Sequence, residues 1–184
     1  MSKLTILPLV NSGFSFIELI TTLSVATVLL AIGVPSFQTL TQSNRMTTAV
    51  NNVVVHLNLA RSEAVKRGID IVLCPSEDGQ DCKDTMLWDE EIIMFTDKNG
   101  NRHVDQEEEL IRYINLNPES IRITTTVKRR KAVYDPRGFS MGYNVTFTFC
   151  DIRNKIDPKS VIISNSGRAR ISDTKSDGTP LDCS

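Results

Sequence analysis

Two arginines near the end of this 184-residue chain have a spacing that suits the recognition of phosphate groups. Arg168 and Arg170 follow Gly167, and in a β-strand both side chains would point to the same face. Glycine lets the backbone turn or approach another group closely, and neighbouring guanidinium groups can donate paired hydrogen bonds to phosphate oxygens. The alternative is that both arginines form ion pairs with Asp173 or with acids elsewhere.

A second group of basic residues could extend such a site. It is the run Lys128, Arg129, Arg130 and Lys131. Because side chains alternate along a strand, only two of the four could share a face, and such runs are otherwise solvated surface. Arg137 and Lys175 could contribute, although the sequence does not place them near Arg168. Aromatic residues are scarce near both groups, which argues against a dedicated groove for single strands.

The acidic segment 97–108 resembles the loop of an EF-hand calcium site. Oxygen-bearing side chains occupy its first, third, fifth, ninth and twelfth positions. The sixth position needs glycine for a sharp turn and is Arg102 here, and no pair of flanking helices is evident. We therefore favour a polar hairpin turn built on Asn99 and Gly100 over a metal site.

The chain shows no pattern of a catalytic centre. Of its two histidines, His56 lies in a helical segment and His103 in the acidic hairpin, and the common catalytic and nucleotide-binding motifs are absent. The four cysteines contain no Cys-x-x-Cys pair, which disfavours zinc. We expect no enzymatic activity, no cofactor and no metal.

The apolar segment from Phe14 to Val34 is long enough to cross a membrane. Its twenty-one residues would span about 31 Å as a helix, roughly the thickness of a bilayer core. Glu18 is its only charge, and a carboxylate at such a place indicates a function, unless the segment is an ordinary anchor that tolerates an acid near its end. The long apolar core follows Gly13, whereas a secretory signal peptide has its apolar core before the cleavage site.

The helical pattern continues beyond Pro35. Apolar residues recur at three- and four-residue steps between residues 50 and 65, and Gly68 is a suitable C-cap. Because the pattern resumes after Pro35, we expect the proline to kink the helix and not to end it. The sequence predicts one helix over residues 14–67, whose second half packs on a domain.

Short β-rich segments replace the helical pattern after Gly68, each bounded by Gly, Pro, Asn or Asp. We predict strands over residues 69–74, 91–96, 110–114, 121–127, 132–134, 145–150 and 161–164. This spacing favours antiparallel pairing. The expected fold class is α+β, with a long N-terminal helix packed on a C-terminal antiparallel β-sandwich or a pair of curved sheets.

The four cysteines fit disulfides better than a metal site. A domain that this anchor carries across a membrane would face an oxidising compartment, where disulfides persist. Three pairings are possible. We favour Cys74–Cys82, which closes a short loop, and Cys150–Cys183, which ties the polar tail to a strand, each with about 2–4 kcal/mol of stabilisation.

Charge is unevenly distributed along the chain, although the net charge is only −1. Residues 77–109 contain twelve acids and three bases, whereas residues 112–137 contain seven bases and two acids. This asymmetry predicts one acidic and one basic surface region. The alternative is a set of solvated loops of mixed sign.

Several segments together resemble a known family. Residues 13–18, Gly-Phe-Ser-Phe-Ile-Glu, are similar to the processing site of type IV pilins and pseudopilins, in which a helix-bending proline often occurs where Pro35 lies. The rest of the chain resembles the GspH/FimT-like minor pilins in segments 56–68, 72–76, 88, 95–100, 135–139, 147–150 and 166–170, in this order.

The resemblance implies how the chain is processed and assembled. Prepilin peptidase would remove the leader after Gly13, and Phe14 would become a methylated N-terminus. Glu18 would pair with the amine of Phe14 on a neighbouring subunit, which agrees with the need of a buried acid for a partner. The leader departs from the family's short basic form, because Lys3 is its only charge and residues 4–10 are apolar.

The resemblance also implies an organisation and a location. We expect a leader over residues 1–13, a transmembrane or filament-core helix over 14–34, an amphipathic half-helix over 35–68 and a β-rich domain over 69–184. The protein would lie in the inner membrane with a periplasmic domain, and then in a pilus at the cell surface with other pilins as partners.

FimT-like members of the family carry a Gly-Arg-x-Arg motif that contacts DNA, which corresponds to Gly167, Arg168 and Arg170 here. The resemblance therefore implies sequence-independent binding of duplex DNA during natural transformation. Contacts to phosphates without contacts to bases would make the binding independent of sequence and sensitive to salt. The alternatives are a structural minor pilin for pilus assembly or adhesion, and a type II secretion pseudopilin.

Overall fold

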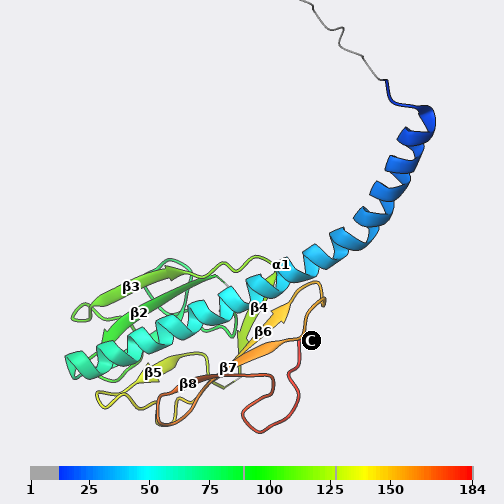
Figure 1. The fold of residues 1–184 in the computed structure, drawn as a ribbon. Coiled ribbons are helices and arrows are strands. Elements are labelled where there is room, and N and C mark those ends of the chain that lie inside the picture. The colour runs from blue at the N-terminus through cyan, green and yellow to red at the C-terminus, as the bar shows by residue number, and fades with distance from the viewer. Residues whose placement is uncertain (1–12, 89, 127, 184) are drawn as a thin grey trace, which may run out of the picture. The chain divides into compact units, whose positions relative to one another are not determined.

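The computed structural model describes residues 13–88, 90–126 and 128–183 (Figure 1). The chain divides into two compact units, Met1–Gln38 and Thr39–Ser184. Apart from Gly13, the leader expected over residues 1–13 lies outside the described residues.

Helix α1 extends from Phe16 to Arg67 and continues through Pro35. Ser15 caps its start, because the Ser15 hydroxyl accepts a 3.3 Å hydrogen bond from the Glu18 N–H, with the Ser-x-x-Glu spacing of a capping box. Gly68, with a φ of +68°, follows its last turn as a C-cap.

The first unit presents an apolar helical surface. Every side chain of residues 14–38 is exposed. Within the described residues, α1 is the one helix long and apolar enough to cross a membrane by length and composition, with a mean hydropathy of 2.1 over its most apolar window.

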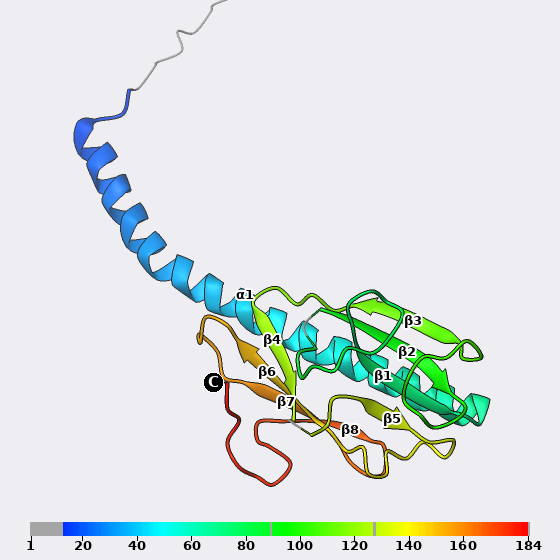
Figure 2. The same cartoon turned by 180° about the vertical axis from the view of Figure 1, so that it is seen from behind.

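Two four-stranded antiparallel sheets form the second unit (Figure 2). The first has the order β3-β2-β1-β5, with β1 (Asp70–Ser76), β2 (Glu91–Asp97), β3 (Leu110–Asn115) and β5 (Ala132–Tyr134). The second has the order β4-β6-β7-β8, with β4 (Ile121–Thr125), β6 (Thr146–Asp151), β7 (Lys159–Ile163) and β8 (Ala169–Ser172). The prediction of an α+β fold with antiparallel strands is confirmed.

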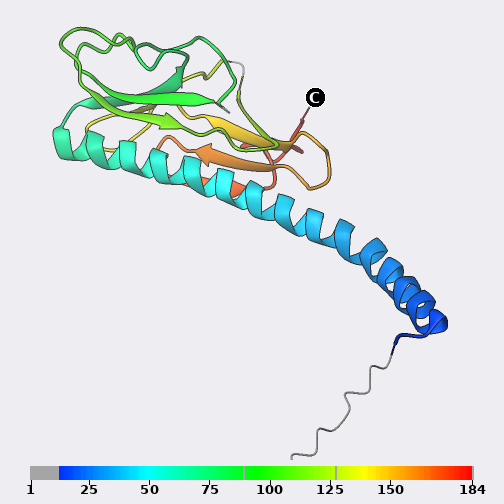
Figure 3. The same cartoon turned by 90° about the horizontal axis from the view of Figure 1, so that it is seen from above.

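One hydrophobic core joins the second half of α1 to both sheets, along which the helix runs in Figure 3. The helix contributes buried residues from Met46 to Ala64, and the sheets contribute alternate residues such as Leu73 and Phe149. Trp88 packs edge-on against Phe147, with ring centroids 4.8 Å apart. The second unit therefore has its own core.

Two disulfides fasten loops to this unit. Cys74 bonds to Cys82, and Cys150 bonds to Cys183, the same two pairs that we favoured from the sequence. The first lies beside a smaller core on the outer face of the first sheet, formed by Val72, Cys74, Ile93, Phe95 and Val133. The second holds the tail that follows β8.

Candidate functional site

The arginine motif lies on a tight turn between β7 and β8. The N–H of Gly167 donates to the carbonyl of Ser164 at 2.8 Å, and the N–H of Ser164 donates to the carbonyl of Arg168 at 3.2 Å. Gly167 has a φ of +73°, which glycine adopts at little cost. Strand β8 begins only at Ala169, so Arg168 belongs to the turn and Arg170 to the strand.

A second loop presses against this turn. A Cβ atom on Gly167 would lie 2.0 Å from the carbonyl oxygen of Gly138, so no larger residue fits there without movement. The N–H of Ser140 donates to the carbonyl of Asn165 at 3.0 Å. Segments 135–140 and 164–168 therefore form one surface.

Arg61 of α1 fastens both segments to the helix. Its Nε donates to the carbonyl of Gly138 at 2.9 Å, and its Nη2 lies 3.5 Å from the carbonyl oxygen of Ser166. The guanidinium thus bridges two backbone carbonyls, which fixes the turn that carries Arg168.

The two arginines of the motif are available to a ligand. Both side chains are exposed, and neither forms an ion pair among the described residues. Asp173, which the sequence suggested as an alternative partner, pairs with Lys159 at 2.5 Å. Local order around the motif therefore comes from the backbone, and the guanidinium groups remain free to bind phosphate.

Strand register shows where Arg170 lies on the second sheet. Arg170 pairs with Ile162 of β7, and Ile162 pairs with Thr146 of β6, so the three lie in a row on one face. A hollow of about 330 Å³ lies on this row. It is lined by Thr126, Lys128, Arg129, Asn144, Val145, Thr146, Ile162, Ile163 and Ser176.

The run of four bases is a loop, not a strand, which corrects the alternation expected for it. Arg129 donates to the carbonyl of Gly142, Arg130 pairs with Asp84, and Lys131 donates to the carbonyl of Arg102. Burial lowers the pKa of Lys131. Of the four, Lys128 is the exposed one and lies at the hollow near Arg170, as does Arg129.

Arg137 and Lys175 differ in their relation to the motif. Arg137 is next to Gly138 and thus beside the arginine turn, and its Nη2 pairs with Asp135 at 2.6 Å. Lys175 is half-buried in the tail, beside Ser176 of the hollow. Burial raises the pKa of Asp135, but hydrogen bonds from Arg137 and from the N–H of Phe139 outweigh it, so the net pKa is lowered.

Sequence reasoning missed an aromatic residue at the site. Phe139 is 40% exposed, and the guanidinium carbon of Arg137 lies 5.4 Å from its ring centroid. Its neighbours Gly138 and Ser140 both contact the arginine turn. The only sequence signal was that residues 135–139 form one of the segments that resemble the family, which does not reveal the contact with residues 164–168.

The calcium-like segment 97–108 begins at the last residue of β2 and lies in the connection from β2 to β3. Arg102 adopts a φ of +66° at the position where glycine is expected, and its guanidinium pairs with Asp97 and Asp70. Asp97, the expected first ligand, thus has a cationic partner within the protein. No group of three His, Cys, Asp or Glu residues in the described chain could hold a metal ion.

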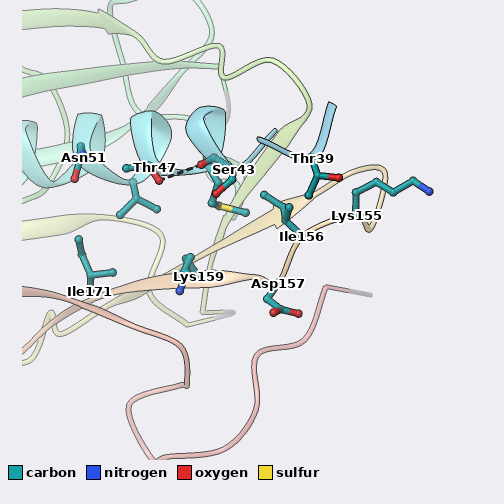
Figure 4. Close-up of a pocket in the computed structure, with 11 residues that line it drawn as sticks. Thr39, Ser43, Thr47, Asn51, Lys155, Ile156, Asp157, Lys159 and Ile171 are labelled. Atoms are coloured by element: carbon teal, nitrogen blue, oxygen red, sulfur yellow. Dashed lines mark hydrogen bonds between the residues drawn. The ribbon is translucent and has the colours of Figure 1, made fainter. Parts of the chain in front are cut away.

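A groove of about 470 Å³ lies between α1 and the second sheet (Figure 4). Its helix side includes Ser43 and Thr47, and its sheet side includes Lys159 and Ile171. Ile171 alternates with Arg170 along β8, so the groove and the motif occupy opposite faces of that strand. The groove is therefore separate from the face of the second sheet that carries Arg170.

Comparisons with known proteins identify relatives of this fold. The model of a family described as type II transport protein GspH matches residues 49–167, which is more than half of the chain and ends just before Arg168. A comparison with curated protein sequences finds no match.

Solved structures of one minor pilin share the fold. The chain is similar to the type IV minor pilin FimU of Pseudomonas aeruginosa strain PAO1, in crystals of space group P21, with a TM-score of 0.57 and 16% identity over 72% of this chain and 92% of that one. The P65 crystal form gives a TM-score of 0.53 and 16% identity over 68% and 91%.

Proposed function

Because the chain belongs to the GspH family, within the type IV pilin superfamily, we propose that it is a minor pilin that binds duplex DNA through Arg168 and Arg170 and assists DNA uptake. The observation that carries the proposal is the exposure of both guanidinium groups without ion-pair partners among the described residues. Arg168 lies on a turn that Gly138 and Arg61 hold in place, and Arg170 lies on β8, which follows that turn.

This arrangement suits phosphates more than base edges. The two arginines lie on a turn and a short strand, whereas reading of bases usually requires an element that enters a groove. Lys128 and Arg129 at the neighbouring hollow extend the same basic surface. Binding should therefore be independent of sequence, strongly weakened by salt and about micromolar or poorer.

The first unit supports a place in a filament. We propose that prepilin peptidase cleaves after Gly13, that residues 14–34 anchor the protein in the inner membrane, and that the second unit is periplasmic until assembly. Glu18 would then meet the amine of Phe14 of an adjacent pilin. The apolar exposed helix supports membrane anchoring and assembly with other pilins.

The proposal is tested with residues 39–184, which contain a core and both disulfides of their own. Binding to two unrelated duplexes is titrated at two salt concentrations. Arg168→Gln and Arg170→Gln should each weaken binding to both duplexes equally and lower the salt slope by about one. Arg153→Gln is the matched control, because Arg153 is exposed and lies at the opposite end of the second sheet.

Two further results show whether Arg168 and Arg170 bind DNA or have a structural role. In cells, the double variant of Arg168 and Arg170 should lower transformation while the free energy of unfolding of the domain stays unchanged. If the double variant binds DNA as the unaltered domain does, the motif is structural. The protein would then be a pilin for assembly or adhesion, or a secretion pseudopilin.

A further inference from the structure

We propose that Phe139 and Arg137 form a stacking platform for an unpaired base, so that the arginine site also binds single-stranded DNA. This inference rests on the proposed function and deepens it, because it names a second form of the ligand. Sequence reasoning disfavoured single strands for lack of nearby aromatic residues, and the fold supplies one.

Phe139 is held at the edge of the arginine turn. Its N–H donates to Asp135 Oδ1 at 3.0 Å, and its carbonyl accepts from the Asp135 N–H at 2.8 Å. On either side of it, Gly138 and Ser140 contact Gly167 and Asn165. With its backbone fixed in this way, Phe139 belongs to the loop that packs against the turn carrying Arg168.

The ring has the exposure that stacking requires. Among the aromatic side chains described in residues 39–183, only Phe139 and Tyr113 are exposed, and the others are partly or fully buried. Tyr113 lies on β3 of the other sheet, where Glu91 accepts its hydrogen bond. Phe139 is therefore the one exposed aromatic side chain of the described domain that adjoins the basic surface.

Arg137 adds charge to the platform. Its guanidinium packs over the Phe139 ring at 5.4 Å while it pairs with Asp135, so it is oriented before a ligand arrives. Bases stack on aromatic rings and on guanidinium planes whatever their sequence. A single strand could place one base on this platform and the adjacent phosphates at Arg168 and Arg170, whereas a duplex keeps its bases stacked and offers only phosphates.

The test compares a short oligothymidine that contains one 2-aminopurine with a duplex of equal length, using residues 39–184. Phe139→Leu should weaken binding of the single strand about tenfold and leave the duplex unchanged. Phe139→Tyr should retain single-strand binding, because it keeps the ring. Tyr113→Leu is the control for loss of an exposed aromatic and should change neither affinity.

Stacking has a signature that a purely structural role for Phe139 would not produce. Quenching of 2-aminopurine fluorescence should occur with the unaltered domain and with Phe139→Tyr, and should disappear with Phe139→Leu. Equal affinities of Phe139→Leu and the unaltered domain for the single strand would overturn the inference, as would an equal loss for both forms of DNA. If the single-strand inference fails in this way but the duplex affinity still falls when Arg168 and Arg170 are replaced, the proposed function stands.

If single strands bind through Phe139 but the duplex does not bind, this inference stands and the duplex proposal fails. If neither form binds the unaltered domain, both fail.

Discussion

Gly167 meets two requirements at once, a left-handed backbone and the absence of a side chain. Its φ is +73°, and a Cβ would lie 2.0 Å from the carbonyl oxygen of Gly138. Gly142 has the same φ of +73° but no atom within 4 Å of the Cβ position. A comparison of substitutions at Gly167 and Gly142 therefore separates the cost of backbone strain from the cost of steric overlap.

We predict that Gly142→Ala costs about 1–3 kcal/mol in unfolding free energy, as expected for a non-glycine residue in this conformation. Gly167→Ala should cost clearly more and should also weaken DNA binding, because the two loops must move apart. Urea unfolding and DNA titration of both variants measure this. Equal losses of stability would show that the contact with Gly138 yields easily.

We predict that His56 makes the stability of the domain sensitive to mild acid. Burial and, to a lesser extent, the charge of Arg112 lower the pKa of His56 below 6.5, and its Nδ1 is buried without a partner in the described structure. As pH falls below 6.5, the unfolded chain takes up a proton that the folded domain resists. The stability present above pH 6.5 is therefore lost as pH falls toward the folded pKa.

The expected result is an unfolding free energy that falls as pH decreases below 6.5, and a smaller fall in His56→Gln. His103→Gln is the matched control, because His103 is exposed and is the other histidine of the chain. Urea unfolding at several pH values measures both. A pH dependence that persists unchanged in His56→Gln would contradict this assignment.

At the scale of elements, the tail depends on the disulfide to β6. Cys150 and Cys183 are 33 residues apart, whereas Cys74 and Cys82 are 8 apart. Loop-closure entropy favours the longer link, so the double change of Cys150 and Cys183 to Ser should cost about 2–4 kcal/mol and more than the change of the shorter pair. Urea unfolding compares the variants. In the variant that lacks Cys150 and Cys183, limited proteolysis should show cleavage within the tail that follows Asp173. A larger loss for the shorter pair would contradict the prediction.

Local patterns predicted the helix from the period of its apolar residues, and most strands from short β-rich runs bounded by turn residues. The strand expected over residues 91–96 is β2 almost to the residue, and its last six residues are buried. Strand β8 was not among the predicted strands, because its four residues form an edge strand without an apolar run and Ile171 is exposed. Long-range pairing with β7 creates it.

The site was predictable only in part. Gly167, Arg168 and Arg170 stand together in the sequence, so their type and spacing were visible. The partners of Arg129 and Arg130 were not, because Gly142 and Asp84 reach them only through the fold. Phe139 was missed for the same reason, since the sequence does not show that its neighbours Gly138 and Ser140 contact the turn that carries Arg168.

At the scale of the whole molecule, acids and bases interleave more than the sequence indicated. Arg130 pairs with Asp84, and Arg45 of the helix pairs with Glu119 of the loop between β3 and β4. The mixed-sign alternative therefore describes part of the surface. Because the net charge is only −1, the DNA binding that we propose requires an attraction that is local to the turn carrying Arg168 and to Arg170.

Glu18 has two possible roles, and one substitution separates them. In the first unit, its backbone N–H donates to the Ser15 hydroxyl, with the Ser-x-x-Glu spacing of a capping box, in which glutamine serves as well as glutamate. The family resemblance instead requires its charge, for a pair with the amine of Phe14 of another subunit. Glu18→Gln keeps the cap and removes the charge.

We predict that Glu18→Gln leaves cleavage after Gly13 intact but abolishes entry into filaments, because a neutral amide cannot balance a buried ammonium group. Mass spectrometry of the membrane fraction should show Phe14 as the N-terminus, and sheared filaments should lack the variant. Gly13→Val run in parallel should give the uncleaved precursor, because the added side chain obstructs the peptidase. Filaments that contain Glu18→Gln at the normal level would assign Glu18 to the cap alone.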